Sequence, residues 1–178
     1  MLNTIIRAAR FSCVALTCCA LLACTPPLDW REVRVTDTPY VVLMPAKPTA
    51  HTRTVKLDGT DIAMTMRGAD VEGVTYAVGA VTLPDEARAA SAARALQAAL
   101  VRNLDGAVRQ EKQLIVSGLP MTAIQVDGKN ARGDAIRLHA RFAARGPFAY
   151  QAVVLGAASK VSAEANDIFL DSFRPGQQ

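Results

Sequence analysis

The stretch Val74–Leu104, VTYAVGAVTLPDEARAASAARALQAALVRNL, contains the change of period that decides the fold class. Before Pro84 the apolar residues alternate with a period of two, which is typical of a β-strand. After Pro84 the chain is rich in Ala, Leu, Arg and Gln, which are good helix formers, and its apolar residues recur at helical spacing. The sequence therefore predicts a strand over Val74–Leu83 and a helix over Asp85–Leu104.

Strand patterns flank this helix on both sides. On its N-terminal side the predicted strands are Asp29–Thr36, Tyr40–Met44, His51–Leu57 and Thr60–Arg67, the last two joined by a tight turn at Asp58-Gly59. On its C-terminal side they are Val108–Ser117, Pro120–Val126, Asp134–Ala143 and Phe148–Leu155, with a turn at Asp127-Gly128 and a final helix over Ser159–Asp171. We expect one globular α+β domain over residues 29–178, with an antiparallel sheet of about six to eight strands and two main helices.

Two short segments resemble the PsbP/Mog family. The first is Tyr40-Val-Val-Leu-Met-Pro45-Ala-Lys-Pro48, an apolar strand that ends in a turn with two prolines. The second is Phe169-Leu-Asp-Ser-Phe173, which closes a helix with a Ser-Phe pair that returns to the core. The resemblance would span most of residues 30–174 and implies an α/β/α sandwich. Because the best-known members of that family are non-enzymatic accessory or assembly factors, it also implies a scaffolding role.

The first 23 residues have the three parts of a secretory signal peptide: two arginines, an apolar run and a small residue, Ala23, at the cleavage position. The apolar run is too short for a transmembrane helix, which needs about 20 residues. Leu21-Leu22-Ala23-Cys24 resembles the lipobox of bacterial lipoproteins, in which the cysteine is acylated and becomes the mature N-terminus. The resemblance implies lipidation at Cys24, with residues 24–28 as the tether. The alternative is an ordinary cleaved signal peptide followed by an incidental cysteine.

Cysteine usage agrees with export and lipidation. All four cysteines lie at or before the proposed cleavage site, so the mature domain would contain one lipidated cysteine and no disulfide: Cys13, Cys18, Cys19 and Cys24. Two or three acyl chains would anchor the protein stably, whereas a single chain holds a protein only marginally. By analogy with lipoprotein sorting, the residue after Cys24, which is not Asp, favours the periplasmic face of the outer membrane. We therefore expect a protein of the bacterial cell envelope.

Composition argues against several classes of function. Apolar residues make up 51% of the chain, which is enough for a packed core. Without Arg7 and Arg10 the chain has 18 basic and 16 acidic residues, and a net charge near +2 is too small for a nucleic-acid-binding protein. The mature chain has two histidines, His51 and His139, on separate predicted strands, so we expect no metal site and no cofactor. We also expect no enzyme, because the sequence lacks a Gly-x-Ser-x-Gly motif and a glycine-rich phosphate loop.

One group of side chains is a candidate binding patch. Arg137, His139 and Arg141 are spaced by two, so they lie on one face of the strand predicted over Asp134–Ala143. Two guanidinium groups and an imidazole could bind an anionic ligand, a lipid headgroup or an acidic partner. The alternative interpretation is a solvated outer face, whose charges pair with a neighbouring strand or are partly covered by a helix.

Three hypotheses for the function follow. The first is a non-catalytic lipoprotein that binds, or helps to assemble, another component of the cell envelope. The second is a carrier of a small ligand or lipid, with an apolar pocket lined by Met64, Met66 and Leu96. The third is a hydrolase whose catalytic residues converge only in the folded chain. The residues favour the first.

Overall fold

The computed structural model describes residues 28–57, 59–130 and 132–177, and the proposed signal peptide and Cys24 lie outside these ranges. The elements in chain order are β1 (Arg31–Val35), β2 (Tyr40–Met44), β3 (Thr49–Leu57), β4 (Thr60–Val71), β5 (Val74–Thr82), α1 (Glu86–Asn103), β6 (Ala107–Val116), β7 (Leu119–Lys129), β8 (Ala135–Arg145), β9 (Phe148–Ala157), α2 (Ala163–Ser172) and β10 (Arg174–Pro175). Among these residues, no helix has both the length and the apolarity to cross a bilayer.

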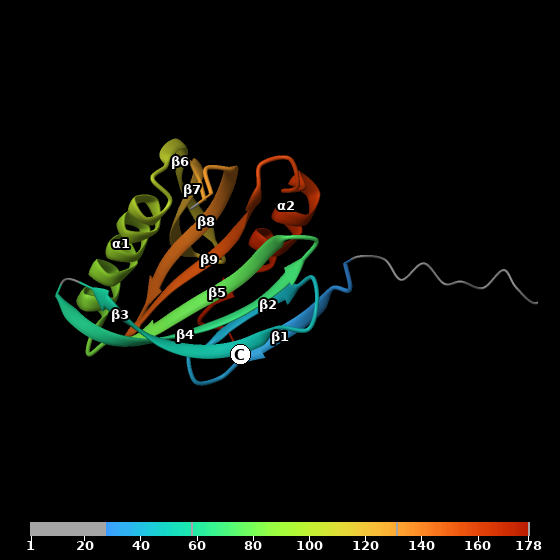
Figure 1. Cartoon of the computed structure of the whole chain (residues 1–178). Helices are drawn as coiled ribbons and strands as arrows, with labels where there is room; N and C mark the ends of the chain where they lie inside the picture. The colour runs from blue at the N-terminus through green and yellow to red at the C-terminus, as the bar shows by residue number, and fades with distance from the viewer. Residues whose placement is uncertain (1–27, 58, 131, 178) are drawn as a thin grey trace, which may run out of the picture.

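Seven strands form one antiparallel sheet in the order β3-β4-β5-β9-β8-β7-β6 (Figure 1). Successive hairpins build its two halves, and β5 pairs with β9 at the centre, with Val78 opposite Ala152. Helix α1 connects the central strand β5 to β6 at the far edge of the sheet. Strands β3 and β6 are therefore the two edges, and only α1 and α2 remain to cover the faces together with the N-terminal strands.

Helix α1 covers one face of the sheet. Asp85 caps its N-terminus by accepting a hydrogen bond from the backbone N–H of Arg88. The buried stripe of the helix consists of Ala89, Ala92, Ala93 and Leu96. It packs on β8 and β9, where small side chains such as Ala140 and Ala149 let the helix approach closely. The predicted helix over Asp85–Leu104 is confirmed.

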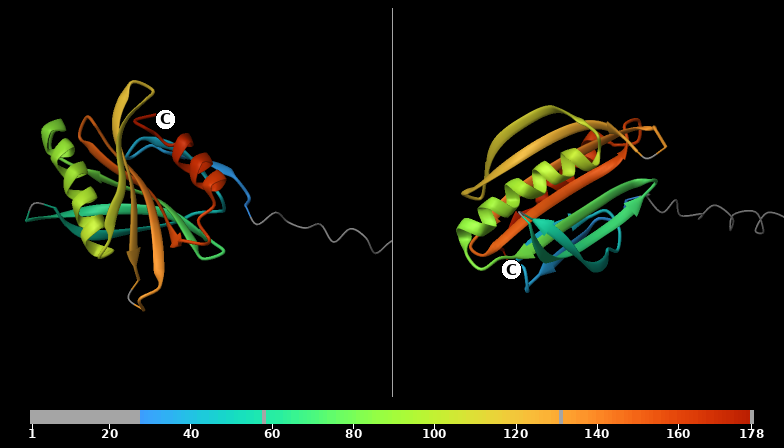
Figure 2. Two further views of the ribbon diagram at one scale, coloured as in Figure 1. Left: turned by 90° about the horizontal axis from the view of Figure 1, so that it is seen from above. Right: turned by 60° about the vertical axis from the view of Figure 1, so that its left-hand side comes forward.

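The opposite face is covered jointly by α2 and a small three-stranded sheet, in the order β1-β2-β10. Figure 2 (left) shows α1 and α2 on opposite sides of the large sheet. Tyr40 from β2, Tyr150 from β9 and Phe173 after α2 form an aromatic cluster with ring centroids 6.0 to 6.3 Å apart. The three rings are almost fully buried and pack edge to face, so they join the small sheet, the large sheet and the C-terminal segment.

The predicted α+β class is wrong, and so is the α/β/α sandwich that the resemblance to the PsbP/Mog family implied. The described residues are 57% strand and 19% helical, and they form two antiparallel sheets, of seven and three strands. The reason is that β1 and β2 do not extend the main sheet: β2 pairs with β1 on one side and with β10 on the other. The fold is therefore β-rich, and a small sheet occupies much of one outer layer.

The turn predicted at Asp127-Gly128 is also wrong. Both residues lie inside β7 and pair with Arg137 and Ile136 of β8, and the chain turns only after Lys129. Gly128 is required there because a side chain would collide with the α1–β6 connection: an added Cβ would lie 2.6 Å from the carbonyl oxygen of Leu104. Gly128 therefore allows the backbone of β7 to lie close to the α1–β6 connection, and the Asp127-Gly128 dipeptide does not form a turn.

Candidate functional site

The three residues of the candidate patch lie on one face of β8, the face that α2 covers in part. Their neighbours Leu138, Ala140 and Phe142 point to the other face and are buried under α1. Within the patch, Arg137 and Arg141 each make an ion pair, whereas the imidazole of His139 lies between them at the wall of a groove. The three side chains therefore have different environments.

Arg137 pairs with the neighbouring strand. Its Nε donates a hydrogen bond to Oδ1 of Asp127 on β7 at 2.9 Å, and Arg109 on β6 approaches the other carboxylate oxygen at 3.3 Å. The hydrogen bond from Arg137 holds the pKa of the Asp127 carboxyl below its usual value. These groups link the three strands β6, β7 and β8 near the surface.

Arg141 binds the C-terminal end of α2. Its guanidinium donates a hydrogen bond to the carbonyl oxygen of Leu170 at 2.7 Å and makes an ion pair with Asp171. Helix carbonyls in the last turn have no partner within the helix, and a cation there also complements the helix dipole. Only 12% of the Arg141 side chain is exposed, so it fixes α2 to the sheet rather than presenting a free charge.

A groove of about 250 Å³ lies between α2 and strands β6, β7 and β8. Its polar walls come from four elements and include amide, ammonium, imidazole and carboxylate groups: Gln110, Lys112, Gln125, His139, Arg141, Asn166 and Asp167. Burial lowers the pKa of His139 below its usual value; Arg137 adds to this effect, while Asp167 and Asp127 oppose it. The fold therefore favours the neutral imidazole over the imidazolium.

Asn166 on α2 is the most unusual residue of the groove. It is 7% exposed, and its Oδ1 is the one buried side-chain oxygen or nitrogen among the described residues that has no hydrogen-bond partner. Its amide group donates to Asp167 at 3.1 Å. An unpaired buried acceptor costs about 1–3 kcal/mol, so a ligand that donated a hydrogen bond here would remove a penalty. The sequence analysis did not single out Asn166, although a polar residue next to the buried stripe of a helix is a signal that could have identified it.

The residues of the proposed apolar pocket lie on the α1 side of the sheet. Met64 and Leu96 line a cavity of about 360 Å³ between β3 and the C-terminal half of α1. Met66 lies beside Gln151, whose amide nitrogen is 3.9 Å from its sulfur. The rim of the cavity is polar, with Arg53, Lys56 and Arg102 among its lining residues.

The remaining titratable residues are dispersed. His51 lies exposed on the edge strand β3, far from β8 in the sheet order. No group of three or more His, Cys, Asp or Glu side chains within the described ranges is arranged to hold a metal ion.

Comparison with known proteins adds information on the fold alone. No protein-family model matches the chain, and no curated protein matches it. A solved structure from Bacteroides thetaiotaomicron is similar with a TM-score of 0.52 at 8% identity, and the match covers 83% of this chain and 49% of that one. The chain thus spans about half the length of that protein. PA94 of Pseudomonas aeruginosa, a protein of unknown function proposed to be a regulator, matches with a TM-score of 0.38 at 9% identity over 73% of this chain and 84% of that one.

Proposed function

We propose that the protein is a non-catalytic lipoprotein of the bacterial cell envelope, anchored through Cys24, that binds an extended segment of a partner protein in the groove beside α2. The observation that carries this proposal is Asn166 in the lining of that groove, a carboxamide that is 7% exposed and whose Oδ1 has no partner among the described residues. Since Arg137 and Arg141 are held in ion pairs, the free polar groups of the groove are mainly carboxamides and Lys112. Such groups recognise a ligand and supply no activated nucleophile.

The chemistry of the groove fits a polypeptide backbone. A carboxamide both donates and accepts hydrogen bonds, as a peptide group does, and Gln110, Gln125 and Asn166 present three of them. The groove also borders β6, an edge strand of ten residues that is mostly exposed and whose Ile115 is 80% exposed. An extended segment could pair with this edge and place alternate side chains over the groove.

Site-specific photo-crosslinking in cells tests this proposal. A photoreactive amino acid at position 110 is expected to give a defined adduct with an envelope protein, whereas the same residue at Arg94, on the exposed side of α1, gives none. The adduct should disappear when Asn166→Leu is added. This substitution removes the unpaired buried Oδ1 together with the hydrogen bond from Nδ2 to Asp167, and because the two effects oppose each other the free energy of unfolding should change little. An adduct that persists in the Asn166→Leu background would contradict the proposal.

A second candidate function, a carrier for a small apolar ligand, rests on the cavity that Met64 and Leu96 line. Gln151 at its wall is 5% exposed and, within the part of the chain that the structure describes, has only the sulfur of Met66 as a weak partner, so a ligand with one polar group could bind there. Native mass spectrometry of the extracted protein tests it. A bound small molecule that Leu96→Phe displaces would favour the carrier function over the binding of a protein segment.

A further inference from the structure

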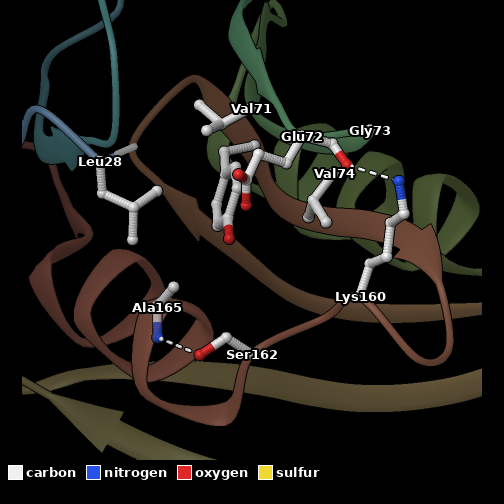
Figure 3. A pocket seen from close by; sticks show the side chains of 9 residues that line it. Leu28, Val71, Glu72, Gly73, Val74, Lys160, Ser162 and Ala165 are labelled. Carbon is white, nitrogen blue, oxygen red and sulfur yellow. Dashed lines mark hydrogen bonds between the residues drawn. The ribbon is translucent and has the colours of Figure 1, made fainter. Parts of the chain in front are cut away.

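A second cavity, of about 490 Å³, lies where the described chain begins, on the side of the large sheet that carries the small sheet and α2 (Figure 3). Leu28 forms one wall, the turn between β4 and β5 forms another, and the segment that leads into α2 closes it with Lys160 and Ser162. Its volume lies in the range of about 300–1,000 Å³ that is typical of small-ligand sites. The proposed partner groove does not include any of these residues.

The buried tyrosine in this cavity, Tyr76, has an unpartnered hydroxyl. The domain has three tyrosines, and the other two have polar partners: the hydroxyl of Tyr150 donates to the carbonyl oxygen of Pro39 at 2.9 Å, and Arg67 lies at the hydroxyl of Tyr40. Tyr76 is 3% exposed and lines the cavity, but its hydroxyl has no hydrogen bond to any described residue. Burial alone raises its pKa, with no charged group acting against it. The ring is buried, but the hydroxyl is not among the fully buried atoms, so it is accessible to a ligand in the cavity and could donate a hydrogen bond to it.

The cavity also presents opposite charges that do not neutralise each other. The ammonium group of Lys160 donates to the backbone carbonyl of Glu72 at 3.1 Å, and neither side chain makes an ion pair within the described ranges (Figure 3). Ser162 caps the N-terminus of α2, a helix of ten residues whose first turn opens on the cavity at Ala165. A helix N-terminus attracts anions through its free N–H groups and its dipole.

From these groups we infer that the cavity binds the headgroup of phosphatidylethanolamine in the membrane surface. The phosphate accepts hydrogen bonds from Lys160 and from the Tyr76 hydroxyl, near the N-terminal end of the α2 dipole. The ethanolamine ammonium pairs with the carboxylate of Glu72. A zwitterion with a hydrogen-bonding ammonium thus satisfies both charges, whereas the quaternary ammonium of phosphatidylcholine has no N–H to donate.

This inference rests on the proposed function, because the lipid anchor brings the cavity to the membrane. Leu28 is four residues from Cys24, and four residues span at most about 14 Å. Trp30, whose ring packs edge to face on Tyr76 with centroids 6.4 Å apart, is partly exposed on the same side. Tryptophan is favoured at the level of lipid headgroups, so the domain would rest on the bilayer with this end.

Trp30 is the single tryptophan of the chain and reports on this cavity. The full-length protein is reconstituted in phosphatidylcholine vesicles that contain a rising fraction of phosphatidylethanolamine, and its fluorescence is recorded. We expect a saturable change. Tyr76→Phe, Lys160→Ala and Glu72→Gln should each raise the fraction needed for half the change about tenfold, which is the effect of losing one hydrogen bond to a charged group. Lys129→Ala, an exposed lysine at the end of β7, should respond as the unaltered protein does.

Three results would overturn the inference. They are no saturable change, a response of the three cavity variants equal to that of the unaltered protein, or the same response to free phosphoethanolamine added to pure phosphatidylcholine vesicles. The last result would assign the cavity to a soluble compound instead of a membrane lipid. The intact mass of the same preparation reports separately on acylation. An unacylated chain that still responds to phosphatidylethanolamine vesicles would contradict lipidation at Cys24 but support headgroup binding in the cavity. An acylated chain that does not respond would support lipidation but contradict headgroup binding.

Discussion

Arg141 on β8 donates a hydrogen bond to the carbonyl oxygen of Leu170, 29 residues later in the chain, at a distance of 2.7 Å. Leu170 lies in the last turn of α2, and the adjacent Asp171 completes the site as an ion-pair partner. A side chain that looks, from the sequence, like one of three equivalent charges on a strand is thus a connection between the sheet and the helix. The groove beside α2 depends on this connection for its shape.

Replacement of Arg141 by Met should therefore destabilise the protein. The change removes a charged donor from a partly buried carbonyl, and we expect the free energy of unfolding to fall by about 1.5–3 kcal/mol. Urea denaturation followed by circular dichroism measures it. Arg94→Met on the exposed side of α1 is the matched control, with an expected change within about 0.5 kcal/mol. Equal effects of the two substitutions would mean that the Arg141 contacts do not stabilise the fold.

The substitutions Tyr150→Phe and Tyr76→Phe should have different effects on the free energy of unfolding. Tyr150→Phe removes a hydrogen bond to the carbonyl of Pro39 and leaves that carbonyl unpaired, at an expected cost of about 1 kcal/mol or more. Tyr76→Phe removes a hydroxyl that has no partner among the described residues, so the free energy of unfolding without lipid should stay the same or rise. Thermal unfolding of the two variants side by side provides the comparison. A Tyr76→Phe loss as large as that of Tyr150→Phe would show that the hydroxyl is already satisfied.

Substitution of Gly128 and of Gly79 by alanine tests how closely other parts of the chain pack against these two strand glycines. Gly128→Ala would place a Cβ 2.6 Å from the backbone oxygen of Leu104, which cannot move without displacing the α1–β6 connection, and should cost about 1–3 kcal/mol. Gly79→Ala meets the ends of Met64 and Met66, which are flexible side chains, and should cost less. Urea midpoints of both variants measure the difference. The reverse order would show that the methionines over Gly79 are held more rigidly than the backbone beside Gly128.

The sequence was most informative where a pattern was local. The change of period at Pro84 identified α1, and alternation identified the faces of β8, because both depend only on neighbouring residues. Alternation does not say which strand pairs with which: Tyr40 and Val42 have the pattern of a half-buried strand in either sheet, and their pairing with β1 and β10 is a long-range choice. The same limit applies to the groove, since Asn166 and His139 meet only after α2 folds onto the sheet.

His139 should make stability depend on pH. Its folded-state pKa is lowered from the usual 6.5 by burial and by Arg137, so below that pH the unfolded chain binds more protons than the folded chain. The free energy of unfolding should therefore fall as the pH is lowered from 7.5 towards 5, and more steeply than in His139→Gln. Urea titrations at several pH values measure the difference between the two proteins. If the unaltered protein instead gained stability relative to His139→Gln as the pH was lowered, the folded state would stabilise the imidazolium.

The lipid anchor is the central claim, since both the partner groove and the headgroup cavity are placed in the envelope by it. The most direct measurement is the intact mass of the membrane-extracted protein, compared with that of Cys24→Ser. The account predicts a species that starts at Cys24 and carries the mass of two or three acyl chains, and predicts its loss in the variant. An unmodified chain in both preparations, released equally into the soluble fraction, would contradict it.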